Sequence, residues 1–119
     1  MPISVESKLV LPASKAPDIS IEDAAKEGKF KVIKQHIATG TDVKARDGFD
    51  SMTALHNAVW GNKREIIELL IASGADVDTK DDDGVTPLDR AFLHKRIETA
   101  YFLRKHGGKT SEVLKFDGE

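Results

Sequence analysis

The chain has 119 residues, enough for one modest domain and too few for two. Its 18 basic and 20 acidic side chains nearly cancel, so no strong field favours nucleic acid as a partner. The absence of cysteine excludes disulfides and thiolate zinc sites, and no apolar run is long enough to span a membrane. We expect a cytoplasmic protein, with an exported form that has lost its signal as the alternative.

Residues 1–18 are expected to form an N-terminal extension that precedes the domain. Ile3, Val5, Leu9 and Leu11 occupy odd-numbered positions, the alternation of a half-buried strand. Two interpretations stay open: a flexible or processed leader, and an extended segment that packs against the domain or against a second copy.

An internal repeat dominates the rest of the chain. Two landmarks recur at the same intervals of 34 and then 33 residues: Ala24, Ala58 and Ala91, and Gly40, Gly74 and Gly107. Between the landmarks each segment reads as two short helices joined by a turn. The apolar stripe of residues 66–71 is too wide for a lone surface helix, so neighbouring units must cover it. The pattern predicts helix pairs that stack side by side.

Three short motifs identify this repeat: TALH at Thr53–His56, TPLD at Thr86–Asp89 and GADV at Gly74–Val77. With a period of about 33 residues they resemble the ankyrin repeat. The resemblance implies an all-α solenoid of three helix-turn-helix repeats with short hairpin loops, at about 19–46, 47–80 and 81–110. Residues 111–119 are left as a C-terminal tail that could begin with a short helix. The close of the chain, RKHGGKT and a polar tail, resembles that of some bacterial ankyrin proteins.

Local residue choices agree with this geometry. Ser20, Thr53 and Thr86 can cap the first helix of each unit, and Pro87 falls at a first helical position, where its missing N–H costs nothing. Gly28 and Asn62 occupy the turn between paired helices, where a left-handed conformation is expected. Lys95 stands at the third such turn, which we therefore expect to be distorted.

The two ends of the stack are predicted to be polar caps, because an open solenoid end faces water. Gln35 and His36 in the first unit and Arg104 in the third replace residues that are apolar in the middle unit. The ankyrin resemblance further implies that His56 bridges hydrogen bonds across its turn and toward the adjoining unit. Asp89, at the matching place in the third unit, can only accept hydrogen bonds, which predicts a looser last interface.

Three motifs suggest other chemistry and are set aside. Gly108-Lys109-Thr110 lacks the earlier glycine that a phosphate loop needs. A calcium loop centred on Gly84 would place Arg90 where a bidentate glutamate belongs. The four histidines lie in different units without the spacing of a zinc site, and no nucleophile stands with a base. We expect neither a cofactor nor a metal, and no enzymatic activity.

The predicted function is protein binding on the concave surface formed by hairpin tips and first helices. The candidate residues are Lys26, Glu27, Arg46, Phe49, Asp50, Met52, Trp60, Lys80, Asp82, Asp83, Val85, Leu93 and His94. The partner is another protein of unknown identity, and neither nucleic acid nor membrane insertion is expected. The alternative is a structural or self-associating role that uses the N-terminal extension, although a monomer is the expected state.

Three apolar candidates carry most of this prediction. Trp60 is either an interface anchor or a packing residue that folds over the neighbouring unit, and both interpretations stay open. Phe49 and Met52 lie in a hairpin that is one residue longer than its counterpart, so we expect it to bulge outward. We interpret them as exposed recognition residues, although a loop phenylalanine can also tuck beneath its own hairpin.

Overall fold

The computed structural model describes residues 17–46 and 51–116. Within these ranges the chain forms α-helices and no strand. The helices are α2 (Ile21–Glu27), α3 (Phe30–Ala38), α4 (Ala54–Trp60), α5 (Arg64–Ala72), α6 (Pro87–Leu93), α7 (Ile97–Lys105) and α8 (Ser111–Phe116). The predicted all-α class is confirmed.

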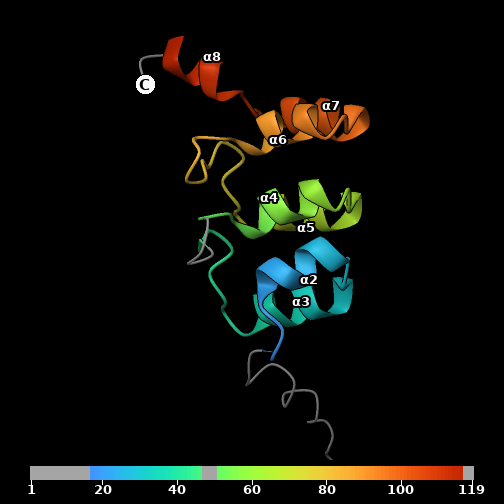
Figure 1. Cartoon of the computed structure of the whole chain (residues 1–119). Helices are drawn as coiled ribbons and strands as arrows, with labels where there is room; N and C mark the ends of the chain where they lie inside the picture. The colour runs from blue at the N-terminus through green and yellow to red at the C-terminus, as the bar shows by residue number, and fades with distance from the viewer. Residues whose placement is uncertain (1–16, 47–50, 117–119) are drawn as a thin grey trace, which may run out of the picture.

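Three helix pairs, α2–α3, α4–α5 and α6–α7, stack as successive layers, with the connecting hairpins along one side (Figure 1). The first helices α2, α4 and α6 pack against one another from layer to layer, and α3 packs on α5. Each pair is too thin to enclose a core of its own, so apolar surface is buried by stacking. The predicted solenoid of three helix-turn-helix units is confirmed.

Each first helix begins at a hydroxyl cap. The Ser20 Oγ accepts from the backbone N–H of Asp23 at 3.0 Å, and Thr53 and Thr86 accept in the same way from His56 and Asp89. His56 and Asp89 return a bond to the cap's own N–H, which completes two capping boxes. Caps at the same place in every layer align the first helices, and the predicted caps are confirmed.

The turn between paired helices contains a left-handed residue in every unit. Gly28 has φ of 82°, while Asn62 and Lys95 both have φ of 58°. The following N–H bonds back to the matching alanine in each case, for example Arg96 to the Ala91 carbonyl at 2.7 Å. The expected distortion at Lys95 is therefore wrong: the layer geometry holds the lysine at positive φ, and its long side chain remains exposed.

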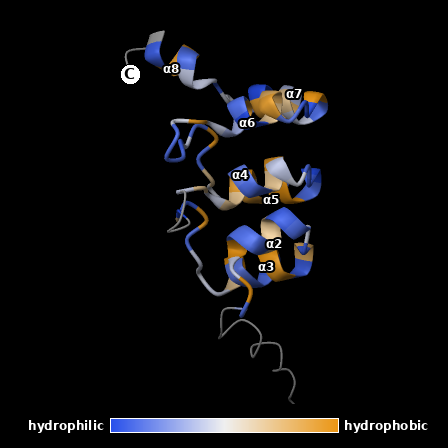
Figure 2. Cartoon of the chain, in the orientation of Figure 1, coloured by the Kyte–Doolittle hydropathy of each residue, from blue (hydrophilic) through white to orange (hydrophobic). Residues whose placement is uncertain are grey.

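The core runs through the middle of the stack, between the layers. Its largest fully buried apolar side chains are Ile33, Leu55, Ile67, Leu70 and Leu103. The landmark alanines of α2, α4 and α6 are also completely buried, which lets the first helices approach closely. Figure 2 shows hydrophobic segments of α3, α5 and α7 beside hydrophilic ones, as amphipathic helices require.

The two ends of the stack differ from each other. In the first unit, His36 is buried, and its ring nitrogens bond to the Ile19 carbonyl at 2.7 Å and the Thr41 hydroxyl at 2.8 Å. His36 therefore makes hydrogen bonds inside the first unit and is not the outward-facing polar group that we predicted. In the third unit Arg104 is exposed as expected, but so are several large apolar side chains, so the prediction of a polar cap there is wrong.

Beyond the third unit the chain turns into the short helix α8, which was expected from the sequence. The Asp89 Oδ2 atom accepts from the N–H of Thr86 at 3.1 Å and from the N–H of Ser111 at 3.0 Å. The carboxylate thus joins the cap of α6 to the start of α8 by accepting twice. An aspartate here connects two segments, although it donates to neither.

Candidate functional site

One repeated position near the ends of the first helices forms a row across the three units: Lys26, Trp60 and Leu93. The Lys26 Nζ lies 4.4 Å from the centroid of the Trp60 ring, which places a cation against the indole. The His94 ring of the third unit stacks on the same indole, with centroids 5.8 Å apart and planes 4° from parallel. Trp60 therefore touches both neighbouring layers.

Trp60 nevertheless presents a large part of its surface to solvent: 40% of the residue is exposed. The indole is thus a packing residue and an available contact at once, and the two interpretations of it are compatible. Because Lys26 and His94 hold it, little side-chain entropy remains to be lost on binding. Leu93, next in the row, is 64% exposed.

His94 is a neutral stacking partner for this indole. Burial lowers its pKa below the ordinary value of 6.5, and the positive charges of Arg90 and Arg96 lower it further. An uncharged imidazole suits a parallel stack between two layers. Glu27 precedes the turn in the first unit, at the place matched by His94, and its carboxylate lies 3.8 Å from the Lys29 ammonium.

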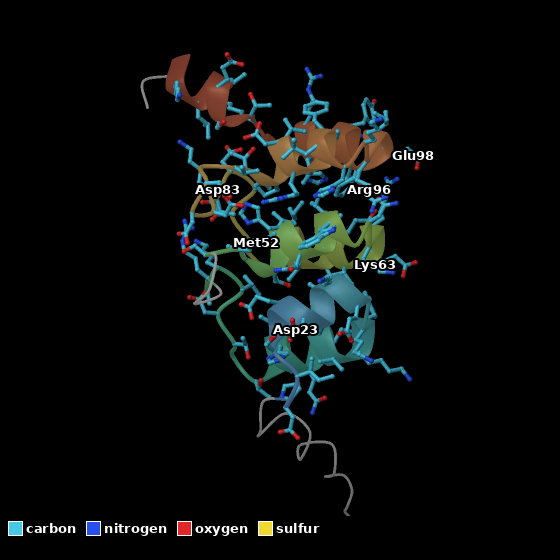
Figure 3. All side chains as sticks on the ribbon, in the orientation of Figure 1. Asp23, Met52, Lys63, Asp83, Arg96 and Glu98 are labelled. Carbon is cyan, nitrogen blue, oxygen red and sulfur yellow. The ribbon has the colours of Figure 1, made fainter. Side chains whose placement is uncertain are left out.

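The hairpins contribute a second group of candidates along one side of the stack. Asp82 and Asp83 are exposed, and Figure 3 places Asp83 on the hairpin side, far from Arg96 at the opposite ends of the helices. Arg46 donates to the Lys80 carbonyl and, at 3.3 Å, to the Ser51 carbonyl. Arg46 thus joins two successive hairpins, so part of its donor capacity is already used inside the chain.

Met52 is not the exposed contact that the sequence predicted. Only 4% of it is accessible, and it stands directly before Thr53, the cap of α4. It therefore offers a partner almost no surface. Phe49 and Asp50, together with most of the predicted outward bulge, lie outside the described residues.

His56 is the polar centre of the second interface. Its Nε2–H donates to the Val85 carbonyl at 2.8 Å, and its Nδ1 accepts from the N–H of Thr53 at 3.2 Å. These two bonds require the neutral ring, because a protonated Nδ1 could not accept. Burial lowers the pKa of His56, which favours this neutral form. The Val85 carbonyl and the negative charge of Asp81 act in the opposite direction and raise the pKa, but burial is the larger effect. The predicted bridging role is confirmed, and Val85 acts in it through its backbone.

Asp81 begins the acidic hairpin and has a different role from its neighbours. Its carboxylate pairs with the Arg90 guanidinium at 2.7 Å and accepts from the N–H groups of Asp83 and Val85. Burial alone would raise its pKa, but these bonds hold the pKa below the ordinary value. The residue that spoils a calcium loop, Arg90, is therefore the partner that organises this turn.

The other motifs set aside in the sequence also have structural explanations. The N–H of Lys109 donates to the Asp78 carboxylate at 2.8 Å, so this amide already binds an anion within the chain. Among the described residues, no three side chains of the metal-binding types are grouped as a metal site. In the same part of the chain, no helix is long and apolar enough to cross a membrane.

Sequence reasoning missed two contacts that join the second and third units. The Arg96 Nη2 donates to the Trp60 carbonyl at 2.9 Å, at the end of α4 where a cation suits the helix dipole. The Thr99 hydroxyl donates to the Asn62 side chain at 3.0 Å. The sequence did contain a signal for the Arg96 contact. A basic residue follows the left-handed turn in every unit, as Lys29, Lys63 and Arg96.

These features define a stacked helix-turn-helix protein with a row of exposed side chains at the ends of its first helices that lie away from the hairpins. The family described as ankyrin repeats (3 copies) matches residues 21–113, which is most of the chain. The chain belongs to the ankyrin-repeat family, whose repeats generally mediate protein–protein interaction and are typically non-catalytic.

The relatives that it resembles carry this repeat within longer chains. It is 40% identical over 85 residues to serine/threonine-protein kinase 12 of Arabidopsis thaliana, covering 71% of this chain and 18% of the kinase. It is 32% identical over 102 residues to the RelA-associated inhibitor of Mus musculus, with coverage of 86% and 12%. An ankyrin repeat-containing protein of Schizosaccharomyces pombe is 30% identical over 95 residues, with coverage of 80% and 44%. The chain thus spans less than half the length of each.

Proposed function

We propose that this chain binds another protein through a concave surface made of its hairpins and first helices, and that it performs no catalysis. The anchor of this surface is the indole of Trp60, which lies in the middle unit with 40% of its area exposed. This exposure is the observation that carries the proposal, because tryptophan is among the residue types that dominate interface energetics.

The chemical character of this surface changes along the row, from charged to aromatic to aliphatic. Lys26 supplies a cation at one end, Trp60 an aromatic ring in the centre and Leu93 an exposed aliphatic side chain at the other end. Asp82 and Asp83 add two exposed carboxylates on the hairpin side. The partner that fits has an apolar segment for Trp60 and Leu93, an acidic group near Lys26 and a basic group near the second hairpin.

The anchor is pre-organised for such a partner. Lys26 and His94 contact the indole from the first and third units, so its orientation depends on the whole stack. A side chain that is already ordered loses little entropy when it binds, and more of the contact energy appears as affinity. The mouse relative is named for an inhibitory role, which is compatible with binding by such a surface.

Capture experiments test this assignment. The immobilised chain and its Trp60→Ala variant are exposed to lysate of the source cells, and retained proteins are quantified by mass spectrometry. Loss of a hot-spot side chain weakens binding by about 2 kcal/mol, or about thirtyfold, so the specific partner should largely disappear. The matched control is Tyr101→Ala, because Tyr101 is an exposed aromatic of a second helix, outside this surface.

The same residue provides a direct readout. Trp60 is the only tryptophan in the chain, so its fluorescence reports on this surface alone. A captured partner added to the purified chain should shift that emission at the concentration at which it binds. Equal retention of the partner by the wild-type and Trp60→Ala chains, with no change of emission, would refute the proposed site.

A further inference from the structure

The third unit ends in an apolar surface that no later layer covers. Three residues before the left-handed turn, the first two units carry Ala25 and Val59, and both are completely buried. They are buried because α4 packs on α2 and α6 packs on α4. The third unit carries Phe92 at this place, and Phe92 is 49% exposed.

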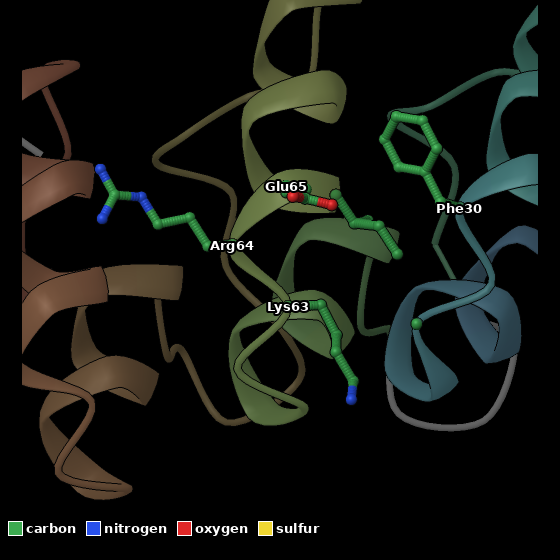
Figure 4. A pocket seen from close by; sticks show the side chains of 6 residues that line it. Phe30, Lys63, Arg64 and Glu65 are labelled. Atoms are coloured by element: carbon green, nitrogen blue, oxygen red, sulfur yellow. The ribbon is translucent and has the colours of Figure 1, made fainter.

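A second repeated position also faces the following layer. It is the first residue of each second helix: Phe30, Arg64 and Ile97. Phe30 lines a hollow together with residues 63–66 of the second unit, and the Arg64 guanidinium lies 4.9 Å from the Phe102 ring of the third unit. Figure 4 shows Phe30 and Arg64 on opposite sides of this hollow, Arg64 extending away from the first unit. Ile97 meets no such layer and is 69% exposed.

The row of first-helix ends follows the same rule. Lys26 lies on Trp60 of the next unit, and Trp60 lies on His94 of the next. Leu93 comes last and is exposed. Phe92, Leu93 and Ile97 are thus the three positions that would contact a fourth layer, and we refer to them as the end face. All three are apolar, where an open end in water calls for polar residues.

Two hollows adjoin the end face. One, of about 380 Å³, runs along Phe92 and Leu93 toward the hairpin, where Asp83 and Asp89 line it. The other, of about 290 Å³, lies on the side of Arg104 and shows the charge that could be accepted there. Leu88, Phe92 and Val113 provide its apolar walls, while Arg104 and Lys109 provide cations. No acidic side chain is among the described residues that line it. The helix α8 lies to the hairpin side of α6 and leaves the end of the stack open (Figure 1).

We propose that the end face is a second interaction surface and that it binds an amphipathic helix of a partner protein, apolar on one side and flanked by carboxylates. A helix is the fitting shape, because the matching surfaces of the first two units are each covered by a helix, α4 or α6. Carboxylates are the fitting flank on the side of Arg104, with which they would pair, whereas Asp83 and Asp89 lie on the other side.

This inference concerns the end of the stack: Leu93 belongs to both surfaces, while Phe92 and Ile97 lie outside the proposed concave site. The test is an NMR titration of the ¹⁵N-labelled full chain with two synthetic amphipathic helices of about 18 residues. Both peptides carry the same leucine and alanine face, flanked by glutamate in one and by lysine in the other. The glutamate peptide should shift the amides of Phe92, Ile97 and Val113 and leave the Trp60 indole N–H in place.

Variants separate the end face from a general apolar effect. Ile97→Asp should weaken binding of the glutamate peptide at least about tenfold, because a carboxylate replaces the apolar contact and repels the carboxylates of the peptide. Phe30→Asp, at the matching position of the first unit and 38% exposed, should leave its affinity unchanged. Raising the salt concentration should weaken binding, since the charges are near the surface.

Three results would overturn the inference. Equal affinity for the glutamate and lysine peptides would remove the charge argument, and absence of binding at millimolar peptide would remove the docking site. Sedimentation that shows a dimer broken by Ile97→Asp would assign the end face to a second copy. A null result here with loss of the natural partner in Trp60→Ala would leave the concave site standing alone.

Discussion

The two interfaces between layers have the same arrangement and are built from different chemistry. Between the first and second units, Gly61 approaches the end of α2 so closely that a Cβ atom there would lie 2.4 Å from the Lys26 carbonyl oxygen. Between the second and third units, directed polar contacts dominate: His56 to Val85, Arg96 to Trp60, and Thr99 to Asn62. The first interface contains a close approach that only glycine permits, and the second is held by buried and part-buried side chains with hydrogen-bond partners.

This contrast teaches how one backbone geometry can tolerate different sequences. A close approach requires only that a position stay small, and it fails through steric overlap. A polar contact requires two groups and fails by leaving one of them buried and unpaired. The two interfaces should therefore respond differently to substitution, to pH and to single-atom changes.

The largest expected effect comes from Gly61→Ala. Gly61 has φ of −76°, which alanine adopts freely, so only the contact with Lys26 opposes the new methyl group. We expect a loss of about 3 kcal/mol in the free energy of unfolding, measured by urea denaturation. The control is Gly74→Ala, which has open space but φ of 102°, and should cost only about 1 kcal/mol. A smaller loss at Gly61 than at Gly74 would contradict the steric account.

Next is His56→Ala at the second interface. The substitution removes a completely buried ring and leaves the Val85 carbonyl and the Thr53 N–H without their bonds. We expect a loss of about 2 kcal/mol in the free energy of unfolding. Hydrogen exchange should localise the loosening to the second and third units. Uniform loosening of all three units would instead indicate that the interfaces are not separable.

The pH dependence should be smaller, because protonation leaves the ring in place. His56 and His94 have folded-state pKa values below 6.5, so the unfolded chain takes up protons more readily than the folded chain. Stability is then fully present above about pH 6.5 and falls as the pH is lowered through that value. Urea midpoints at about pH 7.5 and about pH 5.5 measure this slope, which should diminish in His56→Ala. A free energy of unfolding that rises on acidification would contradict the lowered pKa values of the two histidines.

The smallest effect is expected from Thr99→Val, which removes one hydroxyl and preserves the shape of the side chain. Its bond to the Asn62 side chain is lost, but Asn62 is exposed and can bond to water. We expect a loss of about 0.5–1 kcal/mol, measured as a shift in the urea midpoint. A cost as large as that of His56→Ala would show that this contact is not peripheral.

Much of the fold was predictable because the chain repeats, so a feature recognised in one unit predicts the matching feature in the other two. The hydroxyl caps, the left-handed turns and the role of His56 follow from positions that recur with the period. Lys95 was misjudged because the turn geometry is imposed by the stack and overrides the preference of one residue. The open end was misjudged because a single polar residue, Arg104, was weighed without the neighbouring Phe92 and Ile97.

The candidate surface was less predictable, since exposure depends on contacts between hairpins that no periodicity encodes. Met52 looks like a loop residue in sequence and is buried in the structure. Arg46 looks like a free rim charge and bonds to the next hairpin. The stack of His94 on Trp60 joins residues of two units that do not occupy matching repeat positions.

Site-specific photo-cross-linking in the source cells tests the central claim, binding of a protein partner on the concave surface, most directly. A photoreactive residue is placed at Leu93 in the exposed row, or at Glu68 on the second helix of the middle unit, which is exposed but outside the row. The account predicts a discrete protein adduct from position 93 that is lost when Trp60→Ala is added, and none from position 68. An adduct from position 68 alone, or one at position 93 that is unaffected by Trp60→Ala, would contradict it.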